Sequence, residues 1–328
     1  MTILSVLKQR LRLLLIALVA LLAIWFCTLS VSRIAEESER KAVGSTQNQK
    51  HQNKVAPTEE PAIGYVFPDG AQKLFPGNRL VALYGSPGAS RLGVLGETSV
   101  DQAVARAKEL AAQYQPFSAE RVMPTFEIIA TVASSSATPN NDYSNELDAA
   151  MLAPWVQAAK AAGVYVVLDL QPGRSDFLSQ AKLYETLLRE PNVGLALDPE
   201  WRLQPGQVHM QQIGSVDVSE VNATSTWLAD ITAQGRLPQK LFLVHQFRNS
   251  MISGRERLDT SRSELAYVIQ MDGNGAQSTK LATWQTIRQN APAQVLFGWK
   301  NFYDEDLPVL SPEQSMALDP KPWYISYQ

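Results

Sequence analysis

The chain of 328 residues is poor in the side chains that bind transition metals or form disulfides. It contains one cysteine, Cys27, and three histidines, His51, His209 and His245. A single cysteine excludes an internal disulfide and a zinc site of paired cysteines. There is no H-E-x-x-H motif, and the histidines are far apart in the sequence. We therefore expect no cofactor and no transition-metal site, while a carboxylate site for Ca²⁺ or Mg²⁺ stays open.

The sequence also lacks the motifs of nucleotide and nucleic-acid binding. No G-x-G-x-x-G follows the first apolar run, no G-x-x-x-x-G-K occurs, and no basic run is interleaved with aromatics. Residues 61–328 carry 21 Lys and Arg against 27 Asp and Glu, which argues against nucleic acid as a partner. A G-x-S-x-G motif is missing as well, so an esterase or deacetylase that uses His245 is a minor alternative.

Residues 13–31 form the one long apolar run, and they contain no charge. Nineteen residues nearly span a bilayer core of about 30 Å as a helix. Lys8, Arg10 and Arg12 precede the run, which predicts a cytoplasmic N-terminus. We expect residues 1–34 to be a cytoplasmic stub and a single-pass signal anchor in the cell membrane, with the rest of the chain outside the cytoplasm. A cleaved signal peptide and a buried helix are the alternatives.

Residues 35–61 are rich in Glu, Lys, Gln, Asn and Ser and have few apolar side chains. Such a composition cannot bury a core, so we expect a disordered stalk. Residues 62–328 would then form the folded domain.

Eight apolar, β-rich runs follow residue 75, and most are separated by amphipathic segments typical of helices. The expected strands are 79–85, 122–132, 164–170, 193–198, 241–247, 265–272, 294–299 and 323–327. The expected helices are 99–113, 152–162, 176–189, 221–232 and 280–289. This alternation predicts an α/β fold, a (β/α)8 TIM-type barrel preceded by the transmembrane helix and the polar linker. A doubly wound open sheet is the alternative.

The run 193–201 stands out because it ends in Asp198-Pro199-Glu200-Trp201. Pro199 has no N–H for a sheet, so the strand is expected to end at about Asp198. Because side chains alternate along a strand, Asp198 shares a face with the small residues Gly194 and Ala196, which suits a barrel interior.

The carboxyl ends of barrel strands form active sites, so we expect polar side chains at these ends to meet in one mouth. The expected mouth residues are Tyr84, Asp169, Asp198, Glu200, Trp201, His245, Gln246, Gln270, Asp272 and Trp299. Tyr324 or Tyr327 could join them, and Glu127 inside the second strand is a further candidate. Each also has a structural interpretation, such as a turn for Asp272 or core packing for Trp299.

Acids together with aromatic rings suit carbohydrate, since carboxylates transfer protons and rings stack on sugars. Glycoside hydrolysis needs a protonated acid and a second group that is a base, a nucleophile or a positioning group. Glu200 beside Trp201 is expected to be the acid, because burial would raise its pKa. Asp198, Asp169 or Asp272 would be the second group. His245, Gln246 and Trp299 would bind sugar, with Trp201, Tyr84 and Gln270 beside them.

Asp198-Pro199-Glu200 resembles the Asp-x-Glu ending of the strand-four motif in chitinase-like family 18 glycoside hydrolases. The resemblance implies that Glu200 is the general acid and that Asp198 positions a substrate amide. Ala196 stands where that family has a further aspartate, so the resemblance does not extend to the full substrate-assisted mechanism. Residues 75–328 are also similar to uncharacterised glycoside-hydrolase-like barrel proteins of bacterial cell envelopes.

Together these features predict a membrane-anchored glycoside hydrolase that acts on a cell-envelope or extracellular polysaccharide. The alternative is a barrel that binds envelope glycan or another protein without catalysis. Ala196 and the seventh strand favour this alternative, because that strand ends in Trp299-Lys300-Asn301 where many retaining barrel glycosidases have a glutamate.

Overall fold

The computed structural model describes residue 67 and residues 70–328 of the chain. The predicted signal anchor, the predicted stalk and the first residues of the predicted domain lie outside this part. Among the described residues, none of the helices has the length and apolar character needed to cross a membrane.

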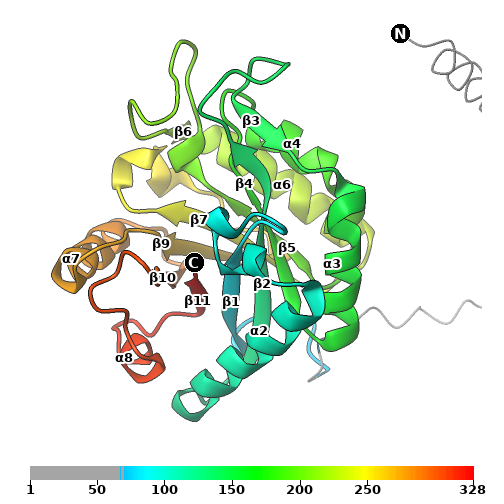
Figure 1. Cartoon of the computed structure of the whole chain (residues 1–328), viewed down its shortest axis with the longest axis vertical. Helices are drawn as coiled ribbons and strands as arrows, with labels where there is room; N and C mark the ends of the chain where they lie inside the picture. The colour runs from blue at the N-terminus through cyan, green and yellow to red at the C-terminus, as the bar shows by residue number, and fades with distance from the viewer. Residues whose placement is uncertain (1–66, 68–69) are drawn as a thin grey trace, which may run out of the picture. The chain divides into compact units, whose positions relative to one another are not determined.

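Eight parallel strands close into a barrel in the described part of the chain (Figure 1). Their order is β1-β11-β10-β9-β7-β5-β4-β2, and pairing of β1 with β2 closes the ring. The strands are β1 (Asn78–Gly85), β2 (Arg121–Ala133), β4 (Tyr165–Leu170), β5 (Val193–Leu197), β7 (Lys240–Gln246), β9 (Leu265–Met271), β10 (Leu296–Asn301) and β11 (Tyr324–Tyr327). The predicted TIM-type barrel is thus confirmed, and each of the eight predicted runs contributes one barrel strand.

Helices follow most barrel strands and lie outside the ring (Figure 1). They are α2 (Val100–Tyr114), α3 (Ala149–Ala162), α4 (Phe177–Leu183), α5 (Glu185–Leu188), α6 (Val218–Gln234), α7 (Gln277–Arg288) and α8 (Pro312–Met316). The helix predicted over 176–189 is split into α4 and α5. The crossover from β7 to β9 consists of the short helices η5 (Asn249–Met251) and η6 (Arg255–Arg257) around β8 (Ile252–Ser253), which pairs with β6 (Val216–Asp217). A short β3 (Ser144–Glu146) pairs antiparallel with β2.

Local sequence explains where the helices begin and end. The Ser99 hydroxyl accepts a hydrogen bond from the Gln102 backbone N–H, and the Gln102 side-chain oxygen accepts one from the Ser99 backbone N–H. This capping box starts α2. Gly163 ends α3 in the left-handed conformation, with φ of 71°. The helix predicted over 99–113 begins at this cap, and the helix predicted over 152–162 ends just before Gly163.

The alternation of side chains along each strand separates two cores. Outward residues such as Leu195 and Leu197 join the large cluster between strands and helices. Inward residues such as Ala196 and Val167 join a smaller cluster inside the barrel. The inner side chains therefore form layers, apolar in the lower and middle parts and polar at the mouth.

The end of the barrel opposite the mouth is closed by residues that precede β1. Phe67, Leu74 and Phe75 are buried in the inner cluster. The Gln239 backbone N–H just before β7 donates to the carbonyl of Gln72, which fixes this segment across the strand starts. These described residues thus fill the lower end of the barrel, and the polar network lies at the other end.

Candidate active site

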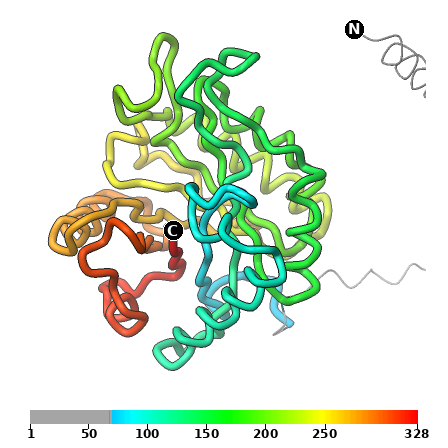
Figure 2. The backbone as a smooth tube through the Cα atoms, in the orientation of Figure 1, coloured from blue at the N-terminus to red at the C-terminus, as the bar shows by residue number. Residues whose placement is uncertain are grey.

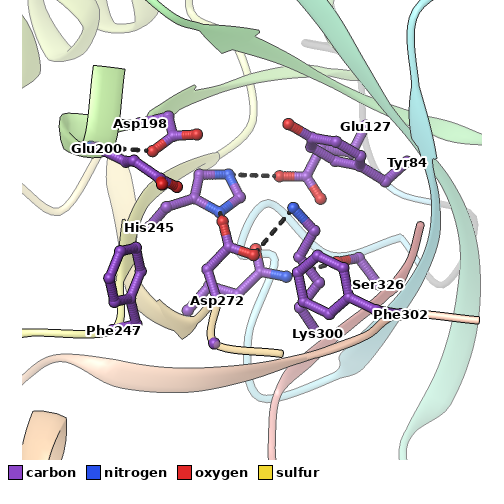
Figure 3. A network of polar contacts seen from close by, with 12 residues as sticks. Tyr84, Glu127, Asp198, Glu200, His245, Phe247, Asp272, Lys300, Phe302 and Ser326 are labelled. Carbon is purple, nitrogen blue, oxygen red and sulfur yellow. Dashed lines mark hydrogen bonds and ion pairs between the residues drawn. The ribbon is translucent and has the colours of Figure 1, made fainter. Parts of the chain in front are cut away.

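Each of the eight barrel strands places a polar side chain at the mouth, most of them at the carboxyl end of the strand. Glu127 lies inside the longer β2, level with Tyr84 at the end of β1. Figure 3 shows the centre of this group. These side chains are buried, with 6% of the Asp272 side chain exposed, and most of them are titratable. They are Tyr84, Glu127, Asp169, Asp198, His245, Gln270 with Asp272, Lys300 and Ser326.

A chain of polar contacts crosses the centre of the mouth. Tyr324 donates its hydroxyl hydrogen to Glu127 Oε2 at 3.0 Å, and Glu127 Oε1 lies 2.9 Å from His245 Nε2. On the other side, His245 Nδ1 lies 3.0 Å from Asp272 Oδ2, and Asp272 Oδ1 lies 3.0 Å from Lys300 Nζ (Figure 3). Because both ring nitrogens face carboxylates, His245 is held as an imidazolium.

The pKa values of the two cations follow from this arrangement. Burial alone would lower the pKa of His245, but the charges of Asp169, Asp272 and Glu127 outweigh it and raise the pKa well above the usual range. Burial also opposes the charge of Lys300, and Asp272 and Glu127 again outweigh it, so its pKa is raised. Both side chains are therefore cationic at neutral pH.

Asp169 belongs to a side branch of the same network. It accepts a hydrogen bond from the Tyr84 hydroxyl at 3.0 Å, and its Oδ1 lies 3.6 Å from His245 Nε2. Burial raises the pKa of Asp169 to about 6, although the positive charge of His245 opposes this. Lys300 Nζ lies 3.6 Å from the centre of the Tyr84 ring, so the phenol packs against a fixed cation.

Asp198 and Glu200 sit on the turn that follows β5. Pro199 opens the short helix η4 (Pro199–Trp201), and Asp198 caps it by accepting a hydrogen bond from the Glu200 backbone N–H at 3.2 Å. This turn directs the Glu200 side chain back toward His245 and Asp272 (Figure 3). Burial raises the pKa of Asp198 well above the usual range of a carboxyl group.

Glu200 and Asp272 differ in how they hold a proton. Burial, with the negative charge of Asp272, raises the pKa of Glu200 to about 7. Burial would also raise the pKa of Asp272, but the positive charges of Lys300 and His245 lower it to about 2. Near neutral pH, therefore, Glu200 still carries a proton in much of the population and Asp272 is ionised.

These two carboxyl groups line one cavity of about 290 Å³ at the mouth. Its wall consists of Tyr84, Leu92, Ile129, Val132, Ala133, Gln171, Asp198, Glu200, Trp201, Asp272, Asn274, Lys300, Phe302, Glu305 and Gln328. We call this space the central cavity. Its volume is at the lower end of the range for small-molecule sites.

Because Gly214 has no side chain, its loop packs directly against the Glu200 backbone, which fixes the position of Glu200 beside the cavity. The Gly214 N–H donates to the Glu200 carbonyl at 2.8 Å, and a Cβ built on Gly214 would lie 2.3 Å from that oxygen. Only glycine allows the 204–215 loop to pass this close.

We expect Gly214→Ala to push the Glu200 backbone out of place. The Glu200 carboxyl would become more exposed, and its pKa would fall from about 7 toward 4.5, the ordinary value of Glu. NMR titration of the carboxyl carbon measures this shift. Ser215→Ala changes the same loop without adding an atom near Glu200 and should leave the titration unchanged. An unaltered titration in Gly214→Ala would show that the close approach does not position Glu200.

Most of the residues expected at the mouth lie in the central cavity or in the network beneath it. Tyr84, Asp198, Glu200, Trp201 and Asp272 line the cavity. Directly below, the buried side chains of Asp169, His245 and Gln270 point into the barrel. Gln270 donates to Ser326 Oγ at 2.5 Å.

Trp299 and Gln246 are not where the sequence analysis put them. Trp299 points away from the cavity, packs edge-on against Trp284 in the outer core and donates its indole N–H to Asn301. Gln246 follows the inward-pointing His245, so it faces outward and accepts a hydrogen bond from Arg255. Both residues lie at the predicted ends of their strands, but their side chains point to the outer face of the barrel and not into the mouth.

Lys300 is the main site residue that the sequence analysis missed. It lies one residue after Trp299, on the inward face shared with Gly298. Strict alternation from the small Gly298 would have selected it. Glu127 was only a minor candidate, yet its contact with His245 places it at the centre of the network.

Comparison with known proteins indicates neither a family nor an activity for this chain. No family model and no curated protein matches the chain. A crystal structure of a xylanase-A-amylase inhibitor protein is similar, with 14% identity, a TM-score of 0.44, and coverage of 76% of this chain and 93% of that one. A 7,8-dihydropteroate synthase from Vibrio fischeri aligns with 12% identity and a TM-score of 0.31, over 76% and 87% of the two chains. Neither similarity is close enough to indicate an activity.

Among the described residues, no group of three or more His, Cys, Asp or Glu side chains is arranged to hold a metal ion. The carboxylates beneath the cavity are directed at His245 and Lys300 instead. The chemistry that this arrangement offers is proton transfer between carboxyl groups of different pKa.

Proposed function

We propose that this protein is a glycoside hydrolase in which Glu200 is the general acid and Asp272 is the base or nucleophile. The observation that carries the proposal is geometric: Glu200 and Asp272 line one cavity, and His245 and Lys300 contact the carboxylate of Asp272, which explains why the pKa values of the two carboxyl groups shift in opposite directions. Two carboxyl groups whose surroundings separate their pKa values in this way have the properties of an acid and its partner in glycosidic bond cleavage.

In this proposal Glu200 donates its proton to the oxygen that links two sugars. Asp272 stays ionised because His245 and Lys300 hold its two oxygens, and it either activates water or attacks the sugar directly. Glu127 and Asp169 balance the charge of His245 from below. Trp201, on the cavity wall, offers an apolar face to a sugar ring.

Glu200→Gln in the full-length protein tests the assignment. The amide keeps the size of the side chain but has no proton to donate, so we expect kcat to fall by at least about 10²-fold. The measurement is the release of reducing ends from a panel of envelope and extracellular polysaccharides. The wild-type protein is expected to cleave at least one member of the panel.

Glu109→Gln is the matched control, because Glu109 lies exposed on α2, away from the mouth. It should keep wild-type activity. Equal activity of Glu200→Gln and wild type on a cleaved glycan would rule out Glu200 as the acid.

One observation favours a second candidate function, glycan binding without cleavage. The mouth end of β10 carries Lys300, where many retaining barrel glycosidases have a glutamate. This candidate predicts that wild type and Glu200→Gln bind a glycan equally well in calorimetry and that neither releases products from it.

The proposal includes a place of action outside the cytoplasm, on a polysaccharide of the cell envelope or its surroundings. It rests on the apolar run 13–31 and the basic residues that precede it. Protease digestion of intact cells tests it, because an external domain should be degraded while a cytoplasmic marker protein survives.

A further inference from the structure

A second hollow lies beside the central cavity and is larger than it. Its volume is about 750 Å³, and we call it the side groove. Its lining residues are Glu200, Trp201, His209, Met210, Gln211, Gln212, Ile213, Gly214, Ser215, Arg248 and Ser250.

The side groove and the central cavity share two lining residues, Glu200 and Trp201. A general acid protonates the oxygen between two sugar units, so it must lie where the sites for those two units meet. Glu200 has this position. If the sugar that is attacked occupies the central cavity beside Asp272, the leaving sugar lies in the side groove.

The side groove is held in shape by hydrogen bonds within the mouth loops. Arg174 donates from Nε and Nη2 to the carbonyl of Gln207, at 3.1 and 2.7 Å. His209 Nε2 lies 3.1 Å from the carbonyl of Tyr143, and the His209 ring contacts Trp201 edge-on with centres 5.3 Å apart. Figure 2 shows the backbone around 140 and around 210 on the same side of the barrel. A groove braced at these points can receive a ligand without first being ordered.

The two spaces differ in charge. The central cavity has the acids Asp198, Glu200, Asp272 and Glu305 on its wall and one cation, Lys300. In the side groove, Glu200 is the only acid on the wall and Arg248 is the permanent cation. Burial lowers the pKa of His209, which keeps that imidazole neutral.

The Arg248 guanidinium is available to a ligand. Arg248 is exposed, and within residues 70–328 no carboxylate of the chain lies at ion-pair distance from it. Its guanidinium carbon lies 5.8 Å from the centre of the Phe247 ring, so an apolar surface supports the charged group. An exposed guanidinium on the wall of a groove is suited to bidentate binding of a carboxylate, sulfate or phosphate.

We propose that the substrate is an anionic polysaccharide, with a negatively charged sugar bound by Arg248 in the side groove and an uncharged sugar in the central cavity. This inference rests on the proposed function and adds the substrate class and the residue that selects it. At about 750 Å³ the side groove has more room than the central cavity of about 290 Å³, so more than one sugar on the leaving side fits.

The test measures binding, so that it is independent of cleavage. Full-length Glu200→Gln is titrated by calorimetry with hexasaccharides of uronate-containing and of sulfated polysaccharides. Each probe is paired with its neutral form, made by carboxyl reduction or desulfation. The same titrations are repeated with Arg248→Gln and with Arg248→Lys added to Glu200→Gln.

We expect Arg248→Gln to weaken binding of at least one anionic probe by tenfold or more, and to change binding of its neutral partner less than twofold. Arg248→Lys should recover part of the loss, because the charge is kept and the bidentate geometry is not. Comparison of the uronate and sulfate probes shows whether Arg248 binds a carboxylate or a sulfate group of the sugar.

Three results would overturn this inference: equal loss for the charged and neutral forms, no loss for the charged form, or no binding of any anionic probe. Failure of the proposed function has a different signature. In that case wild type would cleave none of the probes while the Arg248-dependent binding remained.

Discussion

His245→Ala is expected to lower the free energy of unfolding by about 3–5 kcal/mol at pH 7, because removal of one partner leaves buried charges uncompensated. His245 has no exposed surface, and its ring contacts Glu127, Asp169 and Asp272. Without the imidazolium, these three acids would face one another with Lys300 as the nearest cation. Urea unfolding followed by circular dichroism measures the loss.

The pH dependence of this loss of stability tests whether the charge of His245 is its cause. The pKa of His245 is raised in the folded state, so its stabilisation is fully present below the unfolded value of about 6.5 and is lost only as the pH rises through the raised folded value. The difference between wild type and His245→Ala should therefore shrink at alkaline pH. His245→Gln, which fills more of the space without charge, should lose nearly as much stability at pH 7. A small effect of His245→Gln would mean that packing and not charge stabilises the site.

Asp272→Asn is expected to lower kcat by about 10⁴-fold on any glycan that wild type cleaves, at the upper end of the range for an acid–base group. The amide cannot accept a proton or attack a sugar, and it leaves Lys300 and His245 without the carboxylate between them. Initial rates at saturating glycan measure the loss. Asp101→Asn on the exposed start of α2 is the control and should be fully active.

Across the pH range in which the protein can be assayed, the activity of the wild type should decline on the alkaline side only. Under the proposed roles, activity requires ionised Asp272 and protonated Glu200, whose pKa values are about 2 and about 7. The rate should therefore be flat through mildly acidic pH and fall as the pH rises through about 7. In Glu200→Gln the residual rate should lose this alkaline decline. A wild-type rate that rises above pH 7 would contradict the assigned roles.

The barrel was predictable because its strands are separate in sequence and strongly apolar. Parallel strands buried on both faces appear as apolar runs, and the segments between them have helical periodicity. The runs 164–170 and 193–198 show this clearly, and both form barrel strands. Breaks inside a helix are less visible, as the division of 176–189 at Tyr184 shows, because tertiary packing decides them.

The site was predictable only in part. Whether a side chain reaches the cavity depends on the face of the strand on which it lies, more than on the type of residue. Asp198 was placed on the correct face, since Gly194 and Ala196 mark the inward side of its strand. Trp299 was chosen over Lys300 because tryptophan is common in sugar sites, although alternation turns it outward. The contact of Glu127 with His245 joins β2 and β7, which no local pattern reveals.

The filled lower end of the barrel has a consequence for how a large ligand reaches the polar network. Phe67, Leu74 and Phe75 plug the side where the chain enters the domain, and the mouth opens at the opposite pole. A ligand would therefore enter and leave by the same opening. A polymer could lie across the mouth or insert one end, but it could not thread through the barrel.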